Sequence, residues 1–296
     1  SDSPFQTEYY RVSIKRADPP PQQPDALPGL SSNFFHDELQ AGDIVDVKAP
    51  SGVFFLDLSK HHPIVLIGGG VGLTPMVSML NAICDSGSQR EVWFFYGVDN
   101  GDDYIMKEHL EALEAEHENV HLRLCFSNPK EDEVEGEGFH HAAFVSVELF
   151  KQVLPSSNYD YYLCGPPPMV ASLTTDLREW GVPDADVHLE TFGPASVKKK
   201  APSPENAGAA PTGQVVTFAR SSKNVTWDGS HDSILELAEA NGIELDFGCR
   251  AGSCGTCITA VKTGEVGYVE EPDAQPESGS CLACIAVPKT DLALDA

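Results

Sequence analysis

Short hydrophobic runs alternate with segments of helical spacing from about residue 62 to residue 193. The runs read PIVLIG, EVWFFYGV, HLRLCFS, YDYYLCG and DVHLETF, and helical patterns such as IMKEHLEALEAEHE and MVASLTTDLREW lie between them. Strands that alternate with helices in this way predict an α/β fold with a doubly wound parallel sheet. We expect the first helix of this region to begin at Pro75 and the last to end before Gly181.

The pattern is weaker in the N-terminal part of the chain. Residues 9–15 predict one strand, residues 32–39 a short helix, and residues 43–56 a pair of strands. So few strands cannot bury a core of their own. We therefore expect this part to be an incomplete domain.

A third pattern begins near residue 195. Residues 195–212, ASVKKKAPSPENAGAAPT, have neither helical nor strand periodicity and predict a linker. Beyond the linker, QVVTFAR and NVTWDG predict a β-hairpin. Residues 233–241 predict a helix with Asp232 as its N-cap and Gly242 just past its end.

The charge of the chain excludes some classes of partner. The 296 residues carry a formal net charge of −26, which would repel nucleic acid and anionic lipid, so we expect neither as a partner. No run is long enough to span a bilayer, and no signal peptide is visible. The cysteines cluster at ligand spacing rather than as a disulfide framework, which favours a reducing compartment and predicts a cytoplasmic protein.

The segment from Phe247 to Cys257 places three cysteines at the spacing of a plant-type iron–sulfur cluster. Cys249, Cys254 and Cys257 form a Cys-x4-Cys-x2-Cys pattern, and Cys284 supplies a distant fourth thiolate. The residues between them are small, so the backbone can wrap closely and direct N–H groups at the sulfides. The four cysteines are predicted to be the ligands of a [2Fe–2S] cluster.

A zinc ribbon is the alternative for these cysteines. Cys254 and Cys257 form one Cys-x2-Cys pair, and Cys281 and Cys284 form a second. That arrangement leaves Cys249 and the small-residue loop unexplained. The cluster is therefore favoured, with Cys281 as a non-ligand.

Two motifs in the α/β region predict a dinucleotide site. The turn Gly68-Gly-Gly-Val-Gly-Leu-Thr-Pro75 joins the first strand to its helix, where glycines permit close approach of a pyrophosphate and helix N–H groups favour an anion. The motif Cys164-Gly-Pro-Pro-Pro-Met169 follows a later strand. Open α/β sheets bind their ligands at the carboxyl ends of strands, so the two motifs support one another.

On these motifs, residues 1–194 resemble the ferredoxin–NADP reductase superfamily, most closely the reductase domain of flavohaemoglobins and reductases of phthalate dioxygenase type. The resemblance implies a pyrophosphate site at Gly70, Val71, Gly72, Thr74 and Pro75. It implies that Cys164 lies beside the nicotinamide, with Gly165, Pro166 and Met169 in the same cofactor-binding motif. The segment LETFG is similar to the C-terminal strand of the family, which gives Glu190 and Phe192 roles where nicotinamide meets flavin.

The same resemblance implies a flavin. In the family the flavin lies between a barrel and the nucleotide domain, and the segment Gly29-Leu-Ser-Ser-Asn33 resembles the helix start that holds its phosphates, with Gly29, Ser31, Ser32 and Asn33 as binding residues. An ordinary capped helix is the alternative reading of this segment. FAD is favoured over FMN because the flavohaemoglobin reductase domains give the closest resemblance.

The first residues bear on the boundaries. Ser1-Asp-Ser-Pro4 resembles the residues that follow the Arg-x-Tyr-Ser motif of the family, so we expect the chain to be N-terminally truncated and to start just after that motif. The expected segments are a remnant of an FAD-binding barrel over 1–57, an NAD(P)-binding domain over 58–194, the linker over 195–212, and a β-grasp [2Fe–2S] ferredoxin domain over 213–296.

The choice of dinucleotide depends on the turn after the third strand. Family members that prefer NADPH offer Ser and Arg near the 2′-phosphate, whereas this turn reads Phe126-Ser-Asn-Pro-Lys130 and leads into the carboxylate-rich segment EDEVEGE. Carboxylates repel a further phosphate. NADH is therefore favoured, although Ser127 and Lys130 keep NADPH open.

Together these inferences predict a flavin-dependent NAD(P)H oxidoreductase that passes electrons through FAD to a [2Fe–2S] cluster and on to an oxygenase component or another metalloprotein. A flavin is needed because nicotinamide gives up electrons in pairs and the cluster accepts them singly. The alternative is an electron-transfer module that does not retain flavin in this truncated form. The ferredoxin domain carries −8 over residues 213–296, from 5 basic and 13 acidic side chains, which suits a basic docking surface on the acceptor. A generally acidic surface without a docking role is the alternative, and charge alone favours it.

Overall fold

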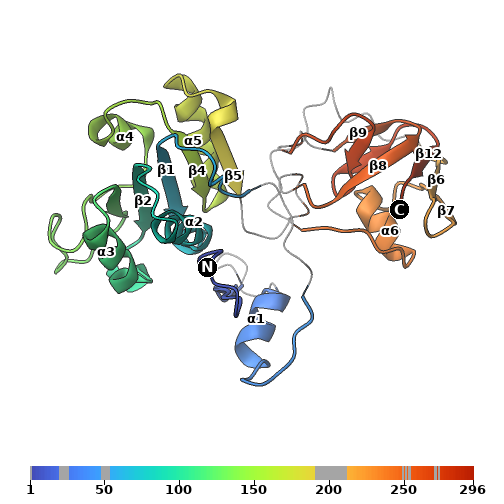
Figure 1. The fold of residues 1–296 in the computed structure, drawn as a ribbon. Helices are drawn as coiled ribbons and strands as arrows, with labels where there is room; N and C mark the ends of the chain where they lie inside the picture. Colours follow the sequence, from blue (N-terminus) through green and yellow to red (C-terminus); the bar gives the residue numbers. More distant parts are fainter. Residues whose placement is uncertain are drawn as a thin grey trace. The chain divides into compact units, whose positions relative to one another are not determined.

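The computed structural model describes residues 2–19, 27–47, 54–190, 212–248, 250, 252, 255–269, 272 and 274–296. The chain divides into two compact units (Figure 1). The first contains residues 1–49 and 56–189, and the second contains residues 50–55 and 190–296.

The first unit is built on a five-stranded sheet. Its strands are β1 (Ile64–Gly69), β2 (Val92–Val98), β3 (Val120–Phe126), β4 (Asp160–Cys164) and β5 (Val187–Glu190). Their order is β3-β2-β1-β4-β5, and β1 runs parallel to both β2 and β4. The strands β2 and β3 follow β1 on one side of the sheet, and β4 and β5 then follow on its other side. The direction in which strands are added therefore reverses at β1, and ligands bind beside the carboxyl end of such a strand. The doubly wound parallel sheet expected from the sequence is confirmed.

Helices cover both faces of this sheet (Figure 1). They are α2 (Leu73–Asp85), α3 (Lys107–Glu116), α4 (Val147–Val153) and α5 (Pro167–Glu179), with short 3-10 turns η1 (Gly70–Gly72), η2 (Gly101–Asp103) and η3 (Asp184–Asp186). Val65, Ile67 and Phe95 pack with α4 and α5 in one core cluster, whereas α2 contacts β1 and α3 contacts β3. Burial on both faces explains why these strands read as continuous hydrophobic runs.

Residues 2–47 contain one helix among the residues described, α1 (Leu30–Asp37). It confirms the short helix expected over 32–39, displaced by two residues. The strands expected over 9–15 and 43–56 are wrong for the described part of these segments, which forms no ladder. A strand forms only where a neighbour takes up its N–H and C=O groups, and the local pattern cannot supply that neighbour. Among the described residues, the region of the expected barrel contains α1 and segments without strand assignment.

The second unit has a mixed sheet and one helix. Its elements are β6 (Val215–Phe218), β7 (Lys223–Thr226), α6 (Ile234–Ala240), β8 (Ile258–Thr263), β9 (Val266–Tyr268), β10 (Ser280–Leu282), β11 (Ala286–Pro288) and β12 (Leu292–Leu294). The order is β10-β8-β12-β6-β7, with β12 parallel to β6, while β9 and β11 form a separate antiparallel pair. Helix α6 packs into the same core as the sheet. This is the β-grasp arrangement expected for the C-terminal domain.

The start of α6 differs from the expectation in one residue. Ser233, not Asp232, is the N-cap, and its hydroxyl accepts a hydrogen bond from Glu236 N at 3.3 Å. Asp232 instead donates its backbone N–H to the Glu236 carboxylate at 2.9 Å. The side chains of Ser233 and Glu236 therefore each accept a backbone N–H at the start of α6. Gly242, with φ +63°, lies just past the helix end as expected.

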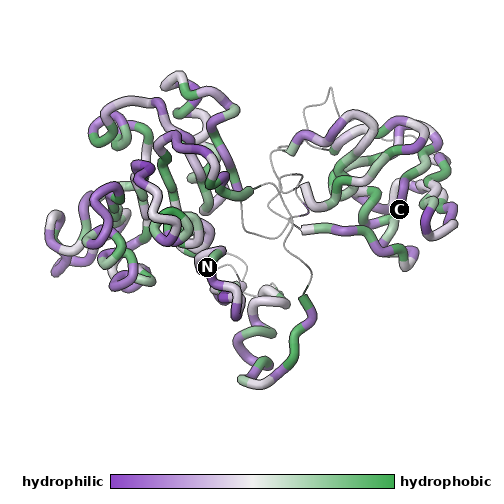
Figure 2. The backbone as a smooth tube through the Cα atoms, in the orientation of Figure 1, coloured by the Kyte–Doolittle hydropathy of each residue, from purple (hydrophilic) through white to green (hydrophobic). Residues whose placement is uncertain are grey.

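Hydropathy follows the strands of each unit. In Figure 2, β1 and its neighbours are coloured as hydrophobic and many of the connecting loops as hydrophilic. All six residues of β1 are buried. Within the part of the chain that the structure describes, no helix is both long and apolar enough to cross a membrane.

Candidate functional site

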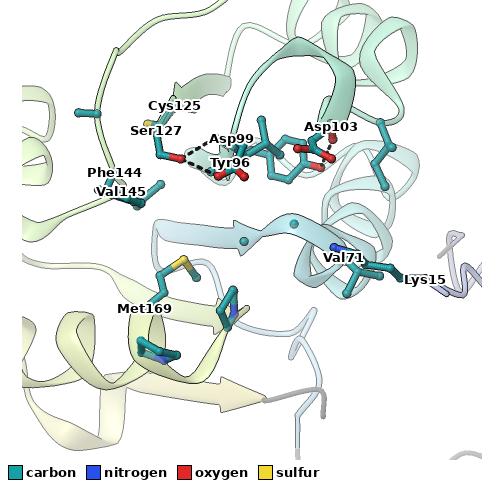
Figure 3. A pocket seen from close by; sticks show the side chains of 18 of the residues that line it. Lys15, Val71, Tyr96, Asp99, Asp103, Cys125, Ser127, Phe144, Val145 and Met169 are labelled. Carbon is teal, nitrogen blue, oxygen red and sulfur yellow. Dashed lines mark hydrogen bonds between the residues drawn. The ribbon is translucent and has the colours of Figure 1, made fainter. Parts of the chain in front are cut away.

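A pocket of about 880 Å³ opens at the carboxyl ends of the parallel strands of the first unit (Figure 3). It is lined by the glycine-rich turn after β1, residues 96–99 at the end of β2, Ser127 after β3, and Pro166 and Met169 after β4. This edge is where open α/β sheets bind ligands. Both dinucleotide motifs therefore contribute to one pocket.

The glycine-rich turn packs directly against the motif that follows β4. A Cβ added to Gly72 would lie 2.5 Å from the carbonyl carbon of Cys164 and 2.8 Å from the backbone N of Gly165. A Cβ added to Gly165 would lie 3.1 Å from both N and Cα of Gly69. The two backbones leave no room for a side chain at Gly72 and crowd one at Gly165. A Cβ added to Gly69 would instead lie 2.8 Å from both Met169 Sδ and Pro166 Cδ, so close packing favours glycine at all three positions.

Gly70 differs from these three glycines. Its φ is +53°, in the left-handed region, and an added Cβ would meet nothing within 4 Å. Gly70 and Val71 line the pocket at the start of the turn into α2. Exposed backbone N–H groups beside a helix start suit an anion. Thr74 and Pro75 lie in the first turn of α2 and do not line the pocket, so their role in binding stays a prediction.

Three side chains at the pocket were not predicted from the sequence. Lys15 lies beside Val71 and is the one basic side chain among the described residues that line the pocket. Asp99 follows β2 directly, and Phe144 lies in the loop before α4, 76% exposed despite its size. A lone Lys or Phe carries no sequence signal. The position of Asp99 after a buried strand was a signal that could have been used.

The two groups that kept NADPH open are both engaged with carboxylates. Ser127 lines the pocket, and its hydroxyl donates to Asp99 Oδ1 at 2.9 Å. Lys130 Nζ lies 2.5 Å from Asp102 Oδ1, and this contact raises the pKa of Lys130. Glu133 accepts hydrogen bonds from the backbone N of Gly101 and of Lys130 at 2.8 and 2.7 Å, which holds the carboxylate-rich loop beside η2.

The residues expected near the nicotinamide fall into different places. Pro166 and Met169 line the pocket, whereas Cys164, the last residue of β4, is fully buried and outside the pocket wall. Glu190 is the last residue of β5, and Phe192 lies outside the described residues. The catalytic roles of Cys164, Glu190 and Phe192 stay predictions.

The residues expected at the flavin phosphates mostly hold α1 in place. Ser32 Oγ accepts from Ala17 N at 3.1 Å and donates to Gly29 O at 3.1 Å. Asn33 Nδ2 donates to the carbonyls of Ala17 and Gly29 at 3.1 and 2.9 Å, and its Oδ1 accepts from Arg16 at 2.7 Å. These bonds tie the start of α1 to residues 16 and 17, although Gly29 at the N-cap makes no side-chain cap hydrogen bond. Phosphate binding by Gly29, Ser31, Ser32 and Asn33 stays a prediction.

The second unit brings two of the four predicted cluster ligands together. Cys257 and Cys284 are buried, and their Sγ atoms lie 3.1 Å apart. The contact with Cys284 lowers the pKa of Cys257 to about 7, which favours the thiolate. Two thiolates bound tetrahedrally to one metal at about 2.3 Å lie about 3.8 Å apart, so this pair fits a shared iron after a small separation.

Cys281 has the opposite character. Its side chain is fully buried, and burial raises the pKa of the thiol to about 12, so the thiol stays protonated. Metal ligands are thiolates, which agrees with Cys281 as a non-ligand. Cys249 and Cys254 lie outside the described residues, and within the described part no three His, Cys, Asp or Glu side chains form a metal site. The complete ligand set therefore stays a prediction.

Comparison with known protein families identifies both regions. Residues 66–175 match the oxidoreductase NAD-binding domain, and residues 217–289 match the 2Fe-2S iron-sulfur cluster binding domain. The second match contains all four predicted ligands and favours the cluster over zinc.

The similar proteins include flavohaemoproteins. The flavohemoprotein of Bacillus thuringiensis subsp. konkukian (strain 97-27) is 39% identical over 196 residues, 66% of this chain and 48% of that protein. The flavohemoprotein of Rhizobium meliloti (strain 1021) is 37% identical over 194 residues, 66% of this chain and 47% of that protein. The chain thus spans about half the length of the curated relatives it matches.

Solved structures support the fold. An intact type IV self-sufficient cytochrome P450 monooxygenase aligns with a TM-score of 0.63 at 21% identity, over 90% of this chain and 31% of that chain. The cytochrome b5 reductase domain of Ulva prolifera nitrate reductase aligns with a TM-score of 0.51 at 26% identity, over 61% of this chain and 70% of that chain. The chain therefore joins an oxidoreductase NAD-binding domain of the ferredoxin–NADP reductase type to a C-terminal 2Fe–2S iron–sulfur cluster binding domain.

Proposed function

We propose that the protein is a reductase that takes a hydride from NADH and passes its two electrons, one at a time, through FAD to the [2Fe–2S] cluster and on to a separate protein. The observation that carries the proposal is the pocket at the carboxyl ends of β1 to β4, formed by both dinucleotide motifs in a chain that also has a cluster domain. FAD, when bound, supplies the change from two-electron to one-electron transfer. The similarity to flavohaemoproteins supports a flavin.

The pocket offers a chemically matched place for each part of NADH. The pyrophosphate suits the backbone at Gly70 and the ammonium of Lys15, because both residues line the pocket. A ribose diol can donate to the Asp99 carboxylate. The ring of Phe144 is exposed in the pocket wall and offers an apolar face for the adenine. The nicotinamide end then lies toward Met169 and Pro166.

The charges around the pocket favour NADH over NADPH. Asp99 and Asp103 line it, and a 2′-phosphate beside Asp99 would face a like charge. Ser127 and Lys130, which would have to bind that phosphate, are already paired with Asp99 and Asp102. Breaking both pairs lowers the affinity for NADPH relative to NADH.

We propose a protein as the electron acceptor, an oxygenase component or another metalloprotein. The cluster domain has 13 acidic and 5 basic side chains, so a basic docking surface complements it. A separate acceptor agrees with the pairing of a nicotinamide domain with a one-electron centre, because such a centre is useful only when its electrons leave singly.

The test is an anaerobic titration of the purified protein after incubation with FAD. NADH is expected to bleach the flavin absorbance and to produce the electron paramagnetic resonance signal of the reduced cluster, with NADPH much slower at equal concentration. If NADH reduces neither centre although FAD is bound, the reductase function is wrong. If the protein holds its cluster but no FAD, the electron-transfer module without flavin is the better description.

A further inference from the structure

Arg250 lies in the cysteine loop, directly after Cys249, in a backbone conformation that non-glycine residues avoid. Its φ is +56°, in the left-handed region. Gly252 and Gly255 have φ of +71° and +73° in the same loop, where glycine meets this requirement without strain. Glycine would therefore suit the backbone at 250 better than arginine, which indicates a use for the arginine side chain.

The guanidinium of Arg250 is held from two sides. It lies 4.0 Å from the centre of the Phe247 ring, within the range of a cation–π contact. It also forms a two-point ion pair with Glu239, in which Nη1 donates to Oε2 at 2.9 Å and Nη2 donates to Oε1. The Arg250 and Glu239 side chains are only 34% and 35% exposed. A forked pair of this kind fixes the orientation of both groups.

Glu239 connects this pair to the rigid part of the domain. It lies on α6, whose Leu235 and Leu237 are buried in the same core cluster as Cys257 and Cys284. Leu235 N also donates to the carbonyl of Ala283, the residue before Cys284, at 2.9 Å. The Arg250–Glu239 pair therefore connects the loop that carries three predicted ligands to α6. Helix α6 is in turn hydrogen-bonded to Ala283, next to the fourth predicted ligand, Cys284.

Arg250 is the basic residue closest in sequence to the predicted ligands Cys249 and Cys254. Two Fe(III) ions, two sulfides and four thiolates together carry net negative charge, and the one electron that reduces an Fe(III) to Fe(II) adds another negative charge without a proton. Three of the four other basic side chains of the domain have their own partners. Arg220 and Lys262 pair with Asp295, and Lys223 donates to the carbonyls of Asn241 and Gly242, while Lys289 lies outside the ligand loop. Arg250 is the basic residue inside the ligand loop.

We propose that Arg250 is a positioning residue for the [2Fe–2S] cluster with two effects. Its pair with Glu239 fastens the ligand loop to α6 and slows loss of the cluster. Its positive charge favours the reduced, more negative state and raises the reduction potential, while Glu239 opposes this effect. The proposal rests on the cluster and not on the reaction with NADH.

The test uses the cluster-loaded full chain and four variants. R250G removes the side chain and relieves the backbone at φ +56°, so it should fold where a larger residue is strained. E239Q removes the opposite charge from the same pair, and R250G/E239Q removes both. R220Q is the matched control, because it also breaks an exposed Arg–Asp pair of this domain, with Asp295, outside the ligand loop. The measurements are a dithionite titration followed by electron paramagnetic resonance, and the rate of bleaching in the presence of an iron chelator.

Opposite shifts of the potential are the expected signature. In R250G the ratio of reduced to oxidised cluster at a fixed potential should fall two- to tenfold, where tenfold is about 59 mV for one electron. E239Q should shift the ratio upward, and the double variant should return toward the wild type. All three should bleach several-fold faster than wild type and R220Q. Shifts of R250G and E239Q in the same direction, or an R250G that matches R220Q in potential and bleaching, would overturn the proposal.

If R250G is recovered without iron, R250K provides the second test. Lysine keeps the charge but cannot form the forked pair. R250K should therefore keep the potential of the wild type and bleach faster. Wild-type potential together with wild-type bleaching in R250K would contradict the role of the ion pair. Because iron content and potential are measured without NADH, failure here is distinct from failure of the proposed reductase function.

Discussion

At the scale of single residues, glycines that share one turn have different reasons to be glycine. Gly72 touches the backbone after β4, whereas Gly70 faces open space with φ +53°. We predict that Gly72→Ala lowers the free energy of unfolding by about 1–3 kcal/mol, because the two motifs must separate. Gly70→Ala should cost about 1 kcal/mol from the backbone alone. Urea unfolding followed by tryptophan fluorescence measures both, and equal losses would contradict this distinction.

Two buried cysteines of the second unit have different predicted roles, Cys257 as a cluster ligand and Cys281 as a non-ligand. Cys257→Ser should abolish stoichiometric iron and labile sulfide, because a serine hydroxyl replaces a thiolate favoured by the contact with Cys284. Cys281→Ser should retain both, because burial keeps that thiol protonated and away from metal chemistry. Iron and sulfide analysis of the purified variants checks the prediction. Retention of the cluster in Cys257→Ser, or its loss from a folded Cys281→Ser, would count against the assigned ligands.

The pairing of Lys130 leads to a prediction on nucleotide preference. Asp102→Asn removes the charge that holds Lys130 Nζ, so the ammonium becomes available to a 2′-phosphate. An exposed ion pair is weak, so the ratio of kcat/KM for NADPH to that for NADH should rise by only about 1.5- to 5-fold. Glu131→Gln, in the loop of Lys130 but not among the carboxylates that raise the pKa of Lys130, is the control. An equal rise in both variants would indicate a general effect of loop charge.

The residues that the sequence revealed are those with partners close along the chain. The glycine-rich turn, the motif after β4 and the cysteine loop each contain their own chemical signal within about ten positions. Lys15 at the glycine-rich turn and Glu239 at Arg250 were missed, because each meets its neighbour only through the fold. Ser32 and Asn33 carried a signal for phosphate, yet their hydrogen bonds are used to hold α1.

At the scale of elements, the strands that were predicted correctly are recognisable from their own apolar residues. β1 to β4 are almost entirely buried, and their apolar runs are visible without knowledge of a partner. The segment over 9–15 alternates apolar and polar residues instead, and Tyr10 and Val12 are 85% and 70% exposed with no ladder assigned to this segment. Pairing depends on a second strand, and the local sequence does not contain that information.

Strand β5 provides a pH-dependent prediction. His188 stacks on Tyr162 at 4.5 Å, and burial lowers the pKa of its imidazole, with Asp160 acting in the opposite sense. The unfolded chain, with a pKa of about 6.5, then binds the proton more readily than the folded one. This contribution to stability is complete above pH 6.5 and is lost as the pH falls below it.

The corresponding experiment compares urea midpoints at pH 7.5 and 5.5. The wild type should lose stability at the lower pH, and His188→Phe, which keeps a ring against Tyr162, should lose less. His61→Phe is the control, because His61 is exposed and no such stack is involved. If the urea midpoints of the wild type and both variants fall equally between pH 7.5 and 5.5, groups other than His188 cause the pH dependence.

At the scale of the whole molecule, the net charge affects the two steps of the proposed reaction differently. The chain carries a net charge of −26, and residues 213–296 contribute −8 of it, from 5 basic and 13 acidic side chains. In the proposed reaction, hydride transfer from NADH uses the pocket on the first unit, whereas the electrons leave through the cluster domain. Long-range attraction therefore affects docking of the acceptor more than the chemistry in the pocket.

We predict opposite salt responses for two acceptors of unlike charge. With FAD present and NADH saturating, the reduction of cytochrome c, a basic protein, should slow several-fold between about 0.02 and 0.3 M salt, because the Debye length falls to below about 10 Å over this range. The reduction of ferricyanide, an anion, should stay constant or rise, because screening removes repulsion. Steady-state rates at matched NADH measure both. Parallel losses for the two acceptors would place the salt effect on NADH or flavin binding and exclude an electrostatic role for the cluster domain in docking.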